Sequence, residues 1–313
     1  MDIFETNLAD KLGIEKKNII AVNSGSAALF LILKIFYSPN STIAMPCYSC
    51  SSIYQAIKLA GHKPLFFDVH ANSVEFDFPE DDLYDAIVVP HLFGLPCSLR
   101  DIPRHKCIED VCQAFGAISN NKFVGSAGRF SVCSFGATKP FTVGGNGGAL
   151  ICRAEQDANI VRQYLDYDMK SNDALGFNFG MSDVNASIGI IQLIRYFQEF
   201  IEKRHRILEE YRKAGINLLL PRIQSDQMIG FRAIAKFNDS RSRDYVKKKL
   251  FNSRICSIVP IARKEIMSNN GESFVGAYSN TENFLSLPCY PNLLEKDLDR
   301  IISEFKKHAN NLN

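Results

Sequence analysis

The stretch RFSVCSFGATKPFTVGGNGGALICR, residues 129–153, decides the fold of this chain. It contains two short apolar runs, which predict buried strands at Arg129–Phe135 and Gly148–Arg153. The segment between them consists mostly of small residues and carries one lysine, Lys139. We therefore expect Lys139 in a loop at the edge of a buried sheet.

Similar apolar runs alternate with helical patterns through the first two thirds of the chain. They predict strands at Asn18–Val22, Thr42–Pro46, Pro64–Val69 and Asp85–Pro90. Several are apolar without alternation, which is typical of parallel strands covered on both faces. Ser26–Phe36 has a helical pattern, and a second helix ends at Gly61, a favoured helix C-cap. The alternation predicts an α/β fold with a mostly parallel central sheet sandwiched by helices.

The pattern changes at Asp183, where we expect the cap of a long helix that continues, with a break, to Ala214. A strand at Ile229–Phe237 and a helix near Arg241–Phe251 follow. A closing helix places four apolar residues on one face: Leu298, Ile301, Ile302 and Phe305. We predict a large domain over residues 1–193. Residues 194–313 should form a long connecting helix and a smaller α+β C-terminal domain.

Charge and hydropathy exclude several classes of partner. The 313 residues include 36 Lys and Arg against 34 Asp and Glu, a net charge of +2, so we expect neither nucleic acid nor a membrane as partner. The N-terminus lacks the pattern of a signal peptide, and the longest apolar stretch, Ala27–Phe36, is too short to cross a bilayer. We therefore expect a cytoplasmic protein.

Familiar metal and nucleotide motifs are missing from the sequence. The nine cysteines are scattered and odd in number, and the six histidines show no HxxxH or HExxH spacing. We therefore expect no disulfide framework, structural zinc or catalytic metal. Neither a strand–GxGxxG–helix fingerprint nor a GxxxxGK[ST] loop occurs, so a Rossmann site and a P-loop are not supported.

In a parallel sheet, sites form at the carboxyl ends of strands, so the residues after each strand are candidates. A helix begins with Ser24-Gly25-Ser26-Ala27, and the free N–H groups at its start favour an anion such as phosphate. The alternative is a simple Ser cap with a tight turn. Cys50 follows the second strand and either lines a pocket or belongs to the next helix cap.

The apolar start at Cys107 leads to Asp110, and an acid at the end of a buried strand needs a cation or good donors, such as a pyridinium N–H. Gln113, three residues on, can reach a neighbouring ligand atom, although a helix-capping acid is the alternative interpretation of this segment. Lys139 can form a Schiff base if it is partly desolvated, and an ordinary surface lysine is the alternative.

The order of these motifs resembles that of the DegT/DnrJ/StrS family of pyridoxal-phosphate-dependent sugar aminotransferases, over nearly the whole chain. The segments that carry the resemblance are Ser24–Ala28, Pro46–Ser49, Gly61–Val69, Pro90–Gly94, Glu109–Ala117, Ser134–Lys139, Gly147–Gly148, Gly176–Ser182, Gln192–Leu193 and Leu285–Pro291. The resemblance implies the type I aminotransferase fold, the cofactor pyridoxal 5'-phosphate, and a homodimer with active sites at the subunit interface.

The resemblance also implies roles for single residues. Lys139 matches the lysine that forms the Schiff base, Asp110 the acid that pairs with the pyridine nitrogen, and Gln113 the residue near the ring hydroxyl. A phosphate cradle corresponds to Gly25, Ser26, Ala27 and Ser134, while Asn178 matches an asparagine that reaches the phosphate of the partner subunit's cofactor. The expected reaction is ping-pong transfer of an amino group from glutamate or glutamine to a nucleotide-linked keto sugar, in the synthesis of an amino sugar for a polysaccharide or secondary metabolite.

Three departures from the family pattern bear on the acceptor. The chain starts close to its first strand, whereas family members carry an additional N-terminal segment that helps cover the site. Cys50 stands where members place an aromatic against the ring, and Gly180 replaces an arginine. Lys139 favours transamination, because related dehydrating enzymes have histidine there.

Two alternatives stay open on these residues. One is a pyridoxal-phosphate aminotransferase acting on a non-nucleotide keto substrate, and the other is a pyridoxal-phosphate-binding regulatory or scaffold protein with little turnover. Loop position makes His91 and the segment Arg254–Arg263 candidates for the acceptor pocket, although for His91 we expect a structural role.

Overall fold

A seven-stranded sheet forms the centre of the protein, in a computed structural model that describes residues 1–168, 175–268 and 273–309. In spatial order its strands are β1 (Ile19–Val22), β9 (Gly148–Cys152), β8 (Phe130–Ser134), β5 (Cys107–Asp110), β4 (Ala86–Pro90), β2 (Thr42–Pro46) and β3 (Lys63–Phe67). The five strands from β8 to β3 are parallel, and β9 runs antiparallel to both β8 and β1. The carboxyl ends of β1, β2, β4, β5 and β8 therefore share one edge.

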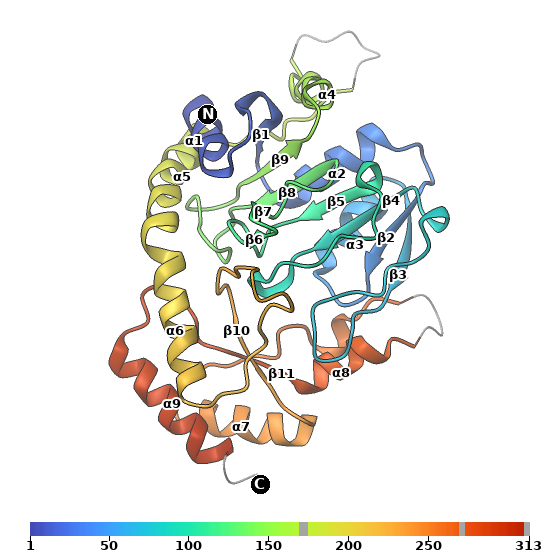
Figure 1. Ribbon diagram of the computed structural model, residues 1–313. Helices are drawn as coiled ribbons and strands as arrows, with labels where there is room; N and C mark the ends of the chain where they lie inside the picture. Colours follow the sequence, from blue (N-terminus) through green and yellow to red (C-terminus); the bar gives the residue numbers. More distant parts are fainter. Residues whose placement is uncertain (169–174, 269–272, 310–313) are drawn as a thin grey trace.

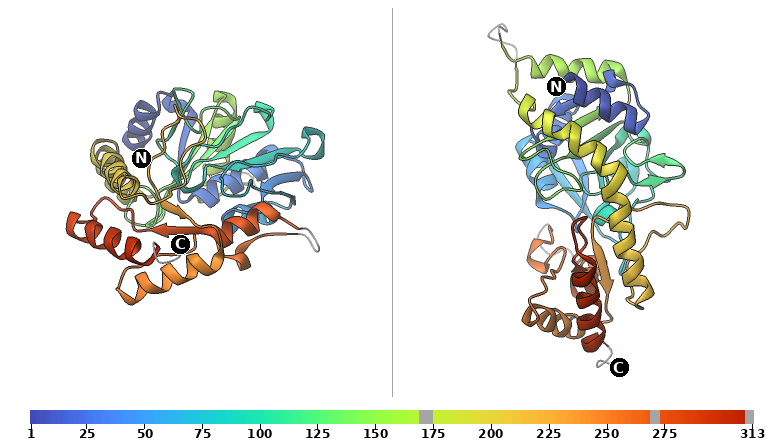
Figure 2. Two further views of the ribbon diagram at one scale, coloured as in Figure 1. Left: turned by 60° about the horizontal axis from the view of Figure 1, so that its bottom comes forward. Right: turned by 90° about the vertical axis from the view of Figure 1, so that its left-hand side faces the viewer.

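Helices cover both faces of this sheet (Figures 1 and 2). On one face lie α2 (Gly25–Phe36), α3 (Ser51–Leu59) and α4 (Glu155–Leu165), and on the other α1 (Asp2–Leu12) and α5 (Asp183–Arg195). Strand β1 shows the pleat that separates the two layers. Ile20 and Val22 belong to the core with α2 and α3, whereas Ile19 and Ala21 pack with α1 and α5.

The predicted mostly parallel α/β sheet is confirmed, and the boundaries of its six predicted strands differ from the observed ones by at most two residues. The strand predicted at Ile229–Phe237 is shorter than expected and spans Ala233–Lys236. The prediction that Asp183 caps α5 was wrong. The cap is Ser182, whose Oγ accepts the Asn185 N–H at 3.2 Å, and Asp183 is the first helical residue. Helices α1 and α4 were not predicted, because each buries only a narrow stripe of residues. In α4 this stripe consists of Ala158 and Val161.

The long helix continues beyond α5 through a π-helical turn, Tyr196–Phe200, into α6 (Ile201–Lys213), so the predicted break is confirmed. The C-terminal part is built on an antiparallel pair, β10 (Ala233–Lys236) and β11 (Phe284–Leu287), flanked by α7 (Ser240–Asn252), α8 (Val275–Asn283) and α9 (Glu295–Ala309). A small hairpin, β6 (Ile118–Ser119) and β7 (Lys122–Phe123), follows β5. A domain boundary at residues 193 and 194 stays a prediction.

A polar junction attaches α8 to the end of β3. The carboxylate of Asp68 accepts hydrogen bonds from the N–H groups of Gly276 and Ala277, both at 2.9 Å, and so caps α8. Asn280, which is fully buried, donates to the carbonyl oxygens of His70 and Ser73. These contacts join residues more than 200 positions apart and fix the C-terminal part against the sheet.

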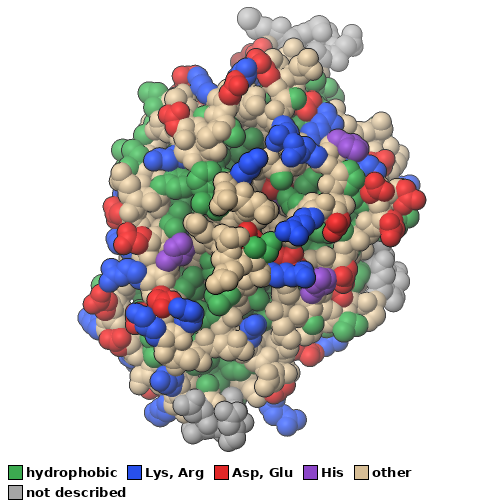
Figure 3. Space-filling model, in the orientation of Figure 1, with side chains coloured by type: hydrophobic (Ala, Val, Ile, Leu, Met, Phe, Trp, Pro, Cys, Tyr) green, Lys and Arg blue, Asp and Glu red, His purple; other side chains and the backbone are tan. Residues whose placement is uncertain are grey.

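The surface agrees with the even charge count of the sequence. Charged side chains of both signs are spread over the face seen in Figure 3, with hydrophobic side chains between them. Within the described part of the chain, none of the helices has the length and apolar character needed to cross a membrane.

Gly276 provides a test of the α8 junction. A Cβ atom on this residue would lie 1.6 Å from the carbonyl oxygen of Val69, so alanine must push the helix away from its cap. We expect Gly276→Ala to lower the free energy of unfolding by about 3 kcal/mol in urea titrations. The control is Gly180→Ala, because no atom lies within 4 Å of the added methyl group. Equal stability of the two variants would contradict this account.

Candidate active site

A cavity of about 240 Å³ lies at the shared carboxyl edge of the sheet. The loops after β1, β2, β4, β5 and β8 contribute to its wall. Seven of the nine residues that the sequence singled out for the cofactor line it: Gly25, Ser26, Cys50, Asp110, Gln113, Ser134 and Lys139. Strand direction explains this convergence, since parallel strands deliver their following loops to the same edge.

Two of the nine residues do not line the cavity. Ala27 is buried in the first turn of α2, and its N–H donates to the Ser24 side chain at 3.1 Å. Asn178 is exposed on the segment that runs beside the end of β1, where Asn23 donates to the carbonyl of Phe179. Asn178 therefore lies outside the cavity of its own chain.

Asp110 and Lys139 bring opposite charges to the cavity without pairing with each other. One carboxylate oxygen of Asp110 accepts the N–H of Cys112 at 2.9 Å. Among the described residues, neither Asp110 nor Lys139 has an ion-pair partner within 4.0 Å. Both side chains affect the pKa of the Cys112 thiol. Burial raises the pKa of Cys112 well above its ordinary value, Asp110 raises it further, and Lys139 lowers it.

Gln113 has a defined orientation in the cavity wall. Its Oε1 accepts the N–H of Phe93 at 2.9 Å. Because a backbone N–H must meet an acceptor, this contact assigns the oxygen and leaves the amide NH₂ group as a donor. Gln113 can therefore donate to an anionic or phenolic oxygen in the cavity.

The first turn of α2 forms a cradle, and the neighbouring strands β8 and β9 approach its backbone closely. Ser24 caps the helix, and geometry leaves the first N–H groups, at Gly25 and Ser26, without intrahelical acceptors. A Cβ on Gly25 would lie 2.9 Å from the Cys112 sulfur and 3.0 Å from the Ser134 Cβ. A Cβ on Gly148 would meet the Ser24 carbonyl carbon at 2.4 Å. Glycine at both positions is thus required by packing, and the cradle has the donors that suit a phosphate group.

The loop that carries Lys139 is held from two sides. The Lys139 N–H donates to the carbonyl of Gly136 at 3.0 Å, which closes a tight turn. From α6, Arg204 donates from Nη2 to the carbonyl of Pro140 at 2.7 Å. Arg204 is only 5% exposed, and burial lowers the pKa of its guanidinium. This arginine therefore positions the lysine loop from within the core.

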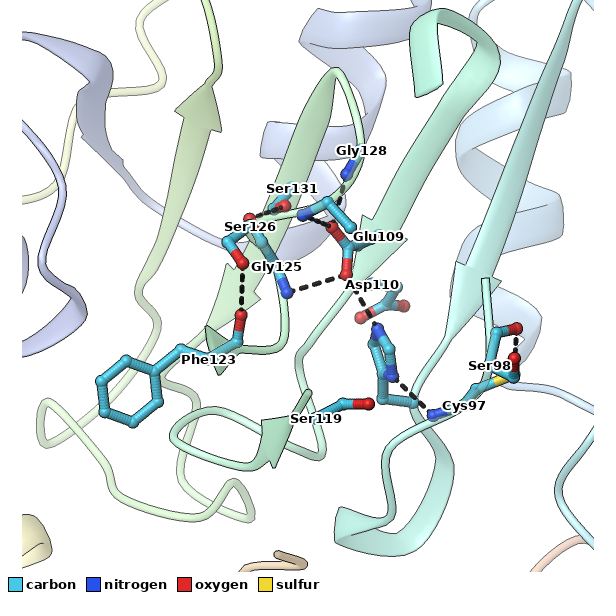
Figure 4. A network of polar contacts seen from close by, with 12 residues as sticks. Cys97, Ser98, Glu109, Asp110, Ser119, Phe123, Gly125, Ser126, Gly128 and Ser131 are labelled. Atoms are coloured by element: carbon cyan, nitrogen blue, oxygen red, sulfur yellow. Dashed lines mark hydrogen bonds and ion pairs between the residues drawn. The ribbon is translucent and has the colours of Figure 1, made fainter. Parts of the chain in front are cut away.

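A buried carboxylate next to Asp110 organises the loops behind the cavity (Figure 4). Glu109 is 1% exposed and accepts four hydrogen bonds, from the N–H groups of Gly125, Ala127 and Gly128 and from His91. Although burial opposes ionisation, the hydrogen bonds from His91, Gly128 and Gly125 hold the pKa of Glu109 below its ordinary value.

His91 links this network to the cavity that it lines. Its Nδ1 accepts the N–H of Cys97 at 3.0 Å, and its Nε2 lies 3.2 Å from the Glu109 carboxylate. Nδ1 is therefore the acceptor of the ring, and Nε2 is the nitrogen that faces the Glu109 carboxylate. A structural role was predicted for His91, whereas Glu109 and Arg204 were not among the predicted site residues. An acid inside the buried run Cys107–Asp110 was the available signal for the network.

The matched family model extends over residues 1–306 and is described as the DegT/DnrJ/EryC1/StrS aminotransferase family. This chain belongs to that family. The type I aminotransferase-like fold predicted from the sequence is confirmed by solved structures. An aminotransferase, TlmJ, from Streptoalloteichus hindustanus has a TM-score of 0.89 at 24% identity, with 100% of this chain and 91% of that chain covered. The PLP form of a sugar aminotransferase, Spr1654, from Streptococcus pneumoniae has a TM-score of 0.86 at 21% identity and the same coverage.

Curated relatives share about a quarter of their residues with this chain. A GDP-perosamine synthase of Escherichia coli O157:H7 is 27% identical over 69% of this chain and 63% of its own length. A dTDP-4-amino-4,6-dideoxy-D-glucose transaminase of Shigella dysenteriae is 27% identical over 97% of this chain and 88% of its own. A 3-oxo-glucose-6-phosphate:glutamate aminotransferase of Bacillus subtilis is 24% identical over 92% and 71%. The chain is thus an aminotransferase-family enzyme related to sugar aminotransferases.

The Glu109 network predicts a pH-dependent stability. The folded pKa of Glu109 lies below its ordinary value of 4.5, so its stabilisation is present above that value and is lost as pH falls through the folded pKa. We expect Glu109→Gln to lower the free energy of unfolding by about 2–4 kcal/mol at pH 7, because an amide NH₂ would face backbone donors. The difference from wild type should narrow at pH 3.5 in urea titrations. Glu209→Gln, on the exposed face of α6, is the control, and a difference that does not change with pH would contradict the assignment.

Proposed function

We propose that this protein is a pyridoxal-phosphate-dependent aminotransferase that moves an amino group from glutamate or glutamine to a nucleotide-linked keto sugar. The observation that carries the proposal is the pair of uncompensated charges, Lys139 and Asp110, that line one cavity beside an anion cradle. A partly buried carboxylate without a cation calls for a donor from a ligand. The family supports the same reaction class.

The residues of the cavity suit each part of the cofactor. The start of α2, with Gly25 and Ser26, and the hydroxyl of Ser134 would hold the phosphate. Asp110 would accept a hydrogen bond from the ring nitrogen and keep it protonated, and Gln113 would donate to the ring oxygen. When bound, pyridoxal phosphate supplies an electron sink for the carbanion of the substrate.

The chain itself contributes attachment and proton transfer. Lys139 supplies the amine that holds the cofactor, and after displacement by a substrate amine its Nζ can move a proton to and from the substrate carbon. The turn at Gly136 and the bond from Arg204 keep this amine at the cavity. Cys50 lines the cavity, and we propose that its thiol contacts the ring face where an aromatic is usual in the family.

The relatives support a phosphorylated sugar as acceptor. Two of the three are named for a GDP-linked and a dTDP-linked sugar, which favours the nucleotide-linked substrate. The third is named for 3-oxo-glucose 6-phosphate and glutamate, which makes a non-nucleotide keto sugar the second candidate. We also propose a homodimer, because exposed Asn178 lies outside the cavity of its own chain, as expected for a residue that serves the partner's site.

Lys139 is the first test of the proposal. Borohydride reduction of the loaded protein should add the mass of the reduced cofactor to the peptide that contains Lys139. We expect Lys139→Ala to show no such adduct and to turn over roughly 10³-fold more slowly or worse. A second lysine variant, Lys58→Ala on the exposed face of α3, should behave like wild type. An adduct on a different lysine would refute the assignment.

The amino-donor half-reaction separates catalysis from a scaffold role. The loaded protein mixed with glutamate or glutamine should lose its visible band within seconds to minutes and yield pyridoxamine phosphate, detected by chromatography. A protein that binds the cofactor but does not change with either donor would be a regulatory or scaffold member rather than an enzyme.

Gly25 tests the phosphate cradle. We expect Gly25→Ala to raise the dissociation constant of pyridoxal phosphate by about 10- to 100-fold, because the methyl group displaces the donors of α2 against Cys112 and Ser134. Fluorescence titration of the apo protein measures this constant. Gly180→Ala is the matched control, since its methyl group would have no described atom within 4 Å. An equal effect of both substitutions would argue against a cradle at α2.

A further inference from the structure

A second cavity, of about 500 Å³, lies in the C-terminal part of the protein. Its wall is formed by the residues before β10, the loop after α7, the end of β11 and the segment that follows it, and α9. Three arginines line it, Arg232, Arg254 and Arg300, against one carboxylate, Asp297. Three positive charges and one negative leave a net charge of +2 on the cavity wall.

Arg232 is partly buried and its guanidinium lies 5.4 Å from the centroid of the Phe231 ring, whereas Arg254 and Arg300 are exposed. Among the described residues, no carboxylate oxygen lies within 4.0 Å of any of the three guanidinium groups. Arg232 has one long hydrogen bond, 3.4 Å to the Ser286 hydroxyl, and Arg300 has one of 3.4 Å to the carbonyl of Ser253. Arg232 is partly buried, and burial lowers its pKa. A partly buried guanidinium without an anionic partner costs free energy unless a bound anion pairs with it.

Arg254 is held in an unusual backbone conformation. Its φ is +57°, the left-handed region that favours glycine, at the C-terminal end of α7. Glycine would adopt this conformation without steric strain, so arginine at this position lowers the stability of the folded state. An observed outlier of this kind points to a function for the side chain.

The cavity also adjoins the wall of the cofactor site. The N–H of Arg232 donates to the carbonyl of Phe93 at 3.3 Å, and the N–H of Phe93 donates to Gln113, which lines the cofactor cavity. Gly94 permits this approach, since a Cβ there would lie 2.9 Å from the nitrogen of Phe231. Two hydrogen bonds made by the backbone of Phe93 therefore join the wall of the arginine cavity to the wall of the cofactor cavity.

A fourth guanidinium lies behind this wall. Arg204 is buried, and its Nε and Nη1 have no hydrogen-bond partner among the described residues. It is close enough to Cys289, which lines the arginine cavity, to lower the pKa of that thiol against the raising effect of burial. Among the residues that the structure describes, no carboxylate affects the pKa of Arg204. The positive potential of the cavity is thus reinforced from the core.

From these observations we infer that the arginine cavity binds the phosphate groups of the acceptor, as a site on Arg232, Arg254 and Arg300 that selects phosphorylated keto sugars. The inference rests on the proposed function and specifies its acceptor. Guanidinium groups bind phosphate oxygens in pairs, and a net charge of +2 matches a diphosphate or a monophosphate ester better than a single carboxylate. Tyr290, half-exposed at the rim, offers an aromatic surface to the sugar or base.

Direct binding tests the site without requiring turnover. Inorganic pyrophosphate, UDP and glucose 6-phosphate are titrated into the cofactor-loaded protein by calorimetry, alongside glutamate. We expect pyrophosphate and at least one of the two esters to bind, and Arg232→Gln to weaken their binding by 10-fold or more. Arg212→Gln, an exposed arginine paired with Glu209, should change affinity by less than twofold. Tighter binding of UDP favours a nucleotide-linked acceptor, and tighter binding of glucose 6-phosphate favours a sugar phosphate.

Arg254→Gly distinguishes function from folding. Because glycine suits a φ of +57°, this variant should have an unchanged or higher melting temperature while losing phosphate affinity by 10-fold or more. The half-reaction with the amino donor should stay within twofold of wild type. A wild-type protein that binds none of the three phosphates at 10 mM, or variants that bind them as tightly as wild type, would overturn the inference.

Two further outcomes have distinct meanings. If Arg232→Gln and Arg254→Gly slow the donor half-reaction and leave phosphate binding unchanged, the arginines bind the donor's carboxylate and the inference is wrong. If the wild-type protein fails the donor half-reaction yet binds pyrophosphate through these arginines, the proposed transamination fails while the phosphate site stands.

Discussion

The buried carboxylate of Glu109 is the constraint on which the arrangement around the cavity depends. A carboxylate that is 1% exposed must be saturated with donors, and it obtains them from three backbone N–H groups and His91. These bonds fix the approach to β8 and the loop after β4. The pleat of β5 then sends the next residue, Asp110, toward the cavity. One strand thus presents a structural acid on one face and, on the other, the acid that we propose binds the cofactor.

Close approach of backbone is the second requirement, and it explains particular glycines. Gly148 on β9 lets the start of α2 lie against the sheet, and Gly25 lets that start lie against Cys112 and Ser134. Gly276 brings α8 onto the end of β3, while Gly94 brings the C-terminal part against the loop after β4. In each case a methyl group would meet an atom at 3.0 Å or less. The cavities therefore depend on steric exclusion as much as on charge.

The two cavities share a principle. In each, charged side chains face open space without a protein partner: Asp110 and Lys139 in the first, Arg232 and Arg254 in the second. Folding alone would favour neutral residues at the half-buried positions Asp110, Lys139 and Arg232, because unpaired charges that are partly desolvated are costly, whereas Arg254 is exposed. The presence of these charges is explained if bound ligands pair with them. The backbone path from Arg232 through Phe93 to Gln113 connects the two sets of charges.

Most strands of the central sheet, its mostly parallel direction and the family could be predicted from the sequence, because apolar runs and the order of motifs along the chain are visible without the fold. The sequence also selected Lys139, Asp110, Gln113 and the start of α2, since strand ends can be read from such runs. Only the tertiary structure decided the rest. The Glu109 network, the bond from Arg204 to Pro140 and the grouping of Arg232, Arg254 and Arg300 join segments far apart in the chain. Apart from the acid inside the buried run Cys107–Asp110, no local pattern marks such residues, because their environment exists only once the sheet and the C-terminal part have packed together.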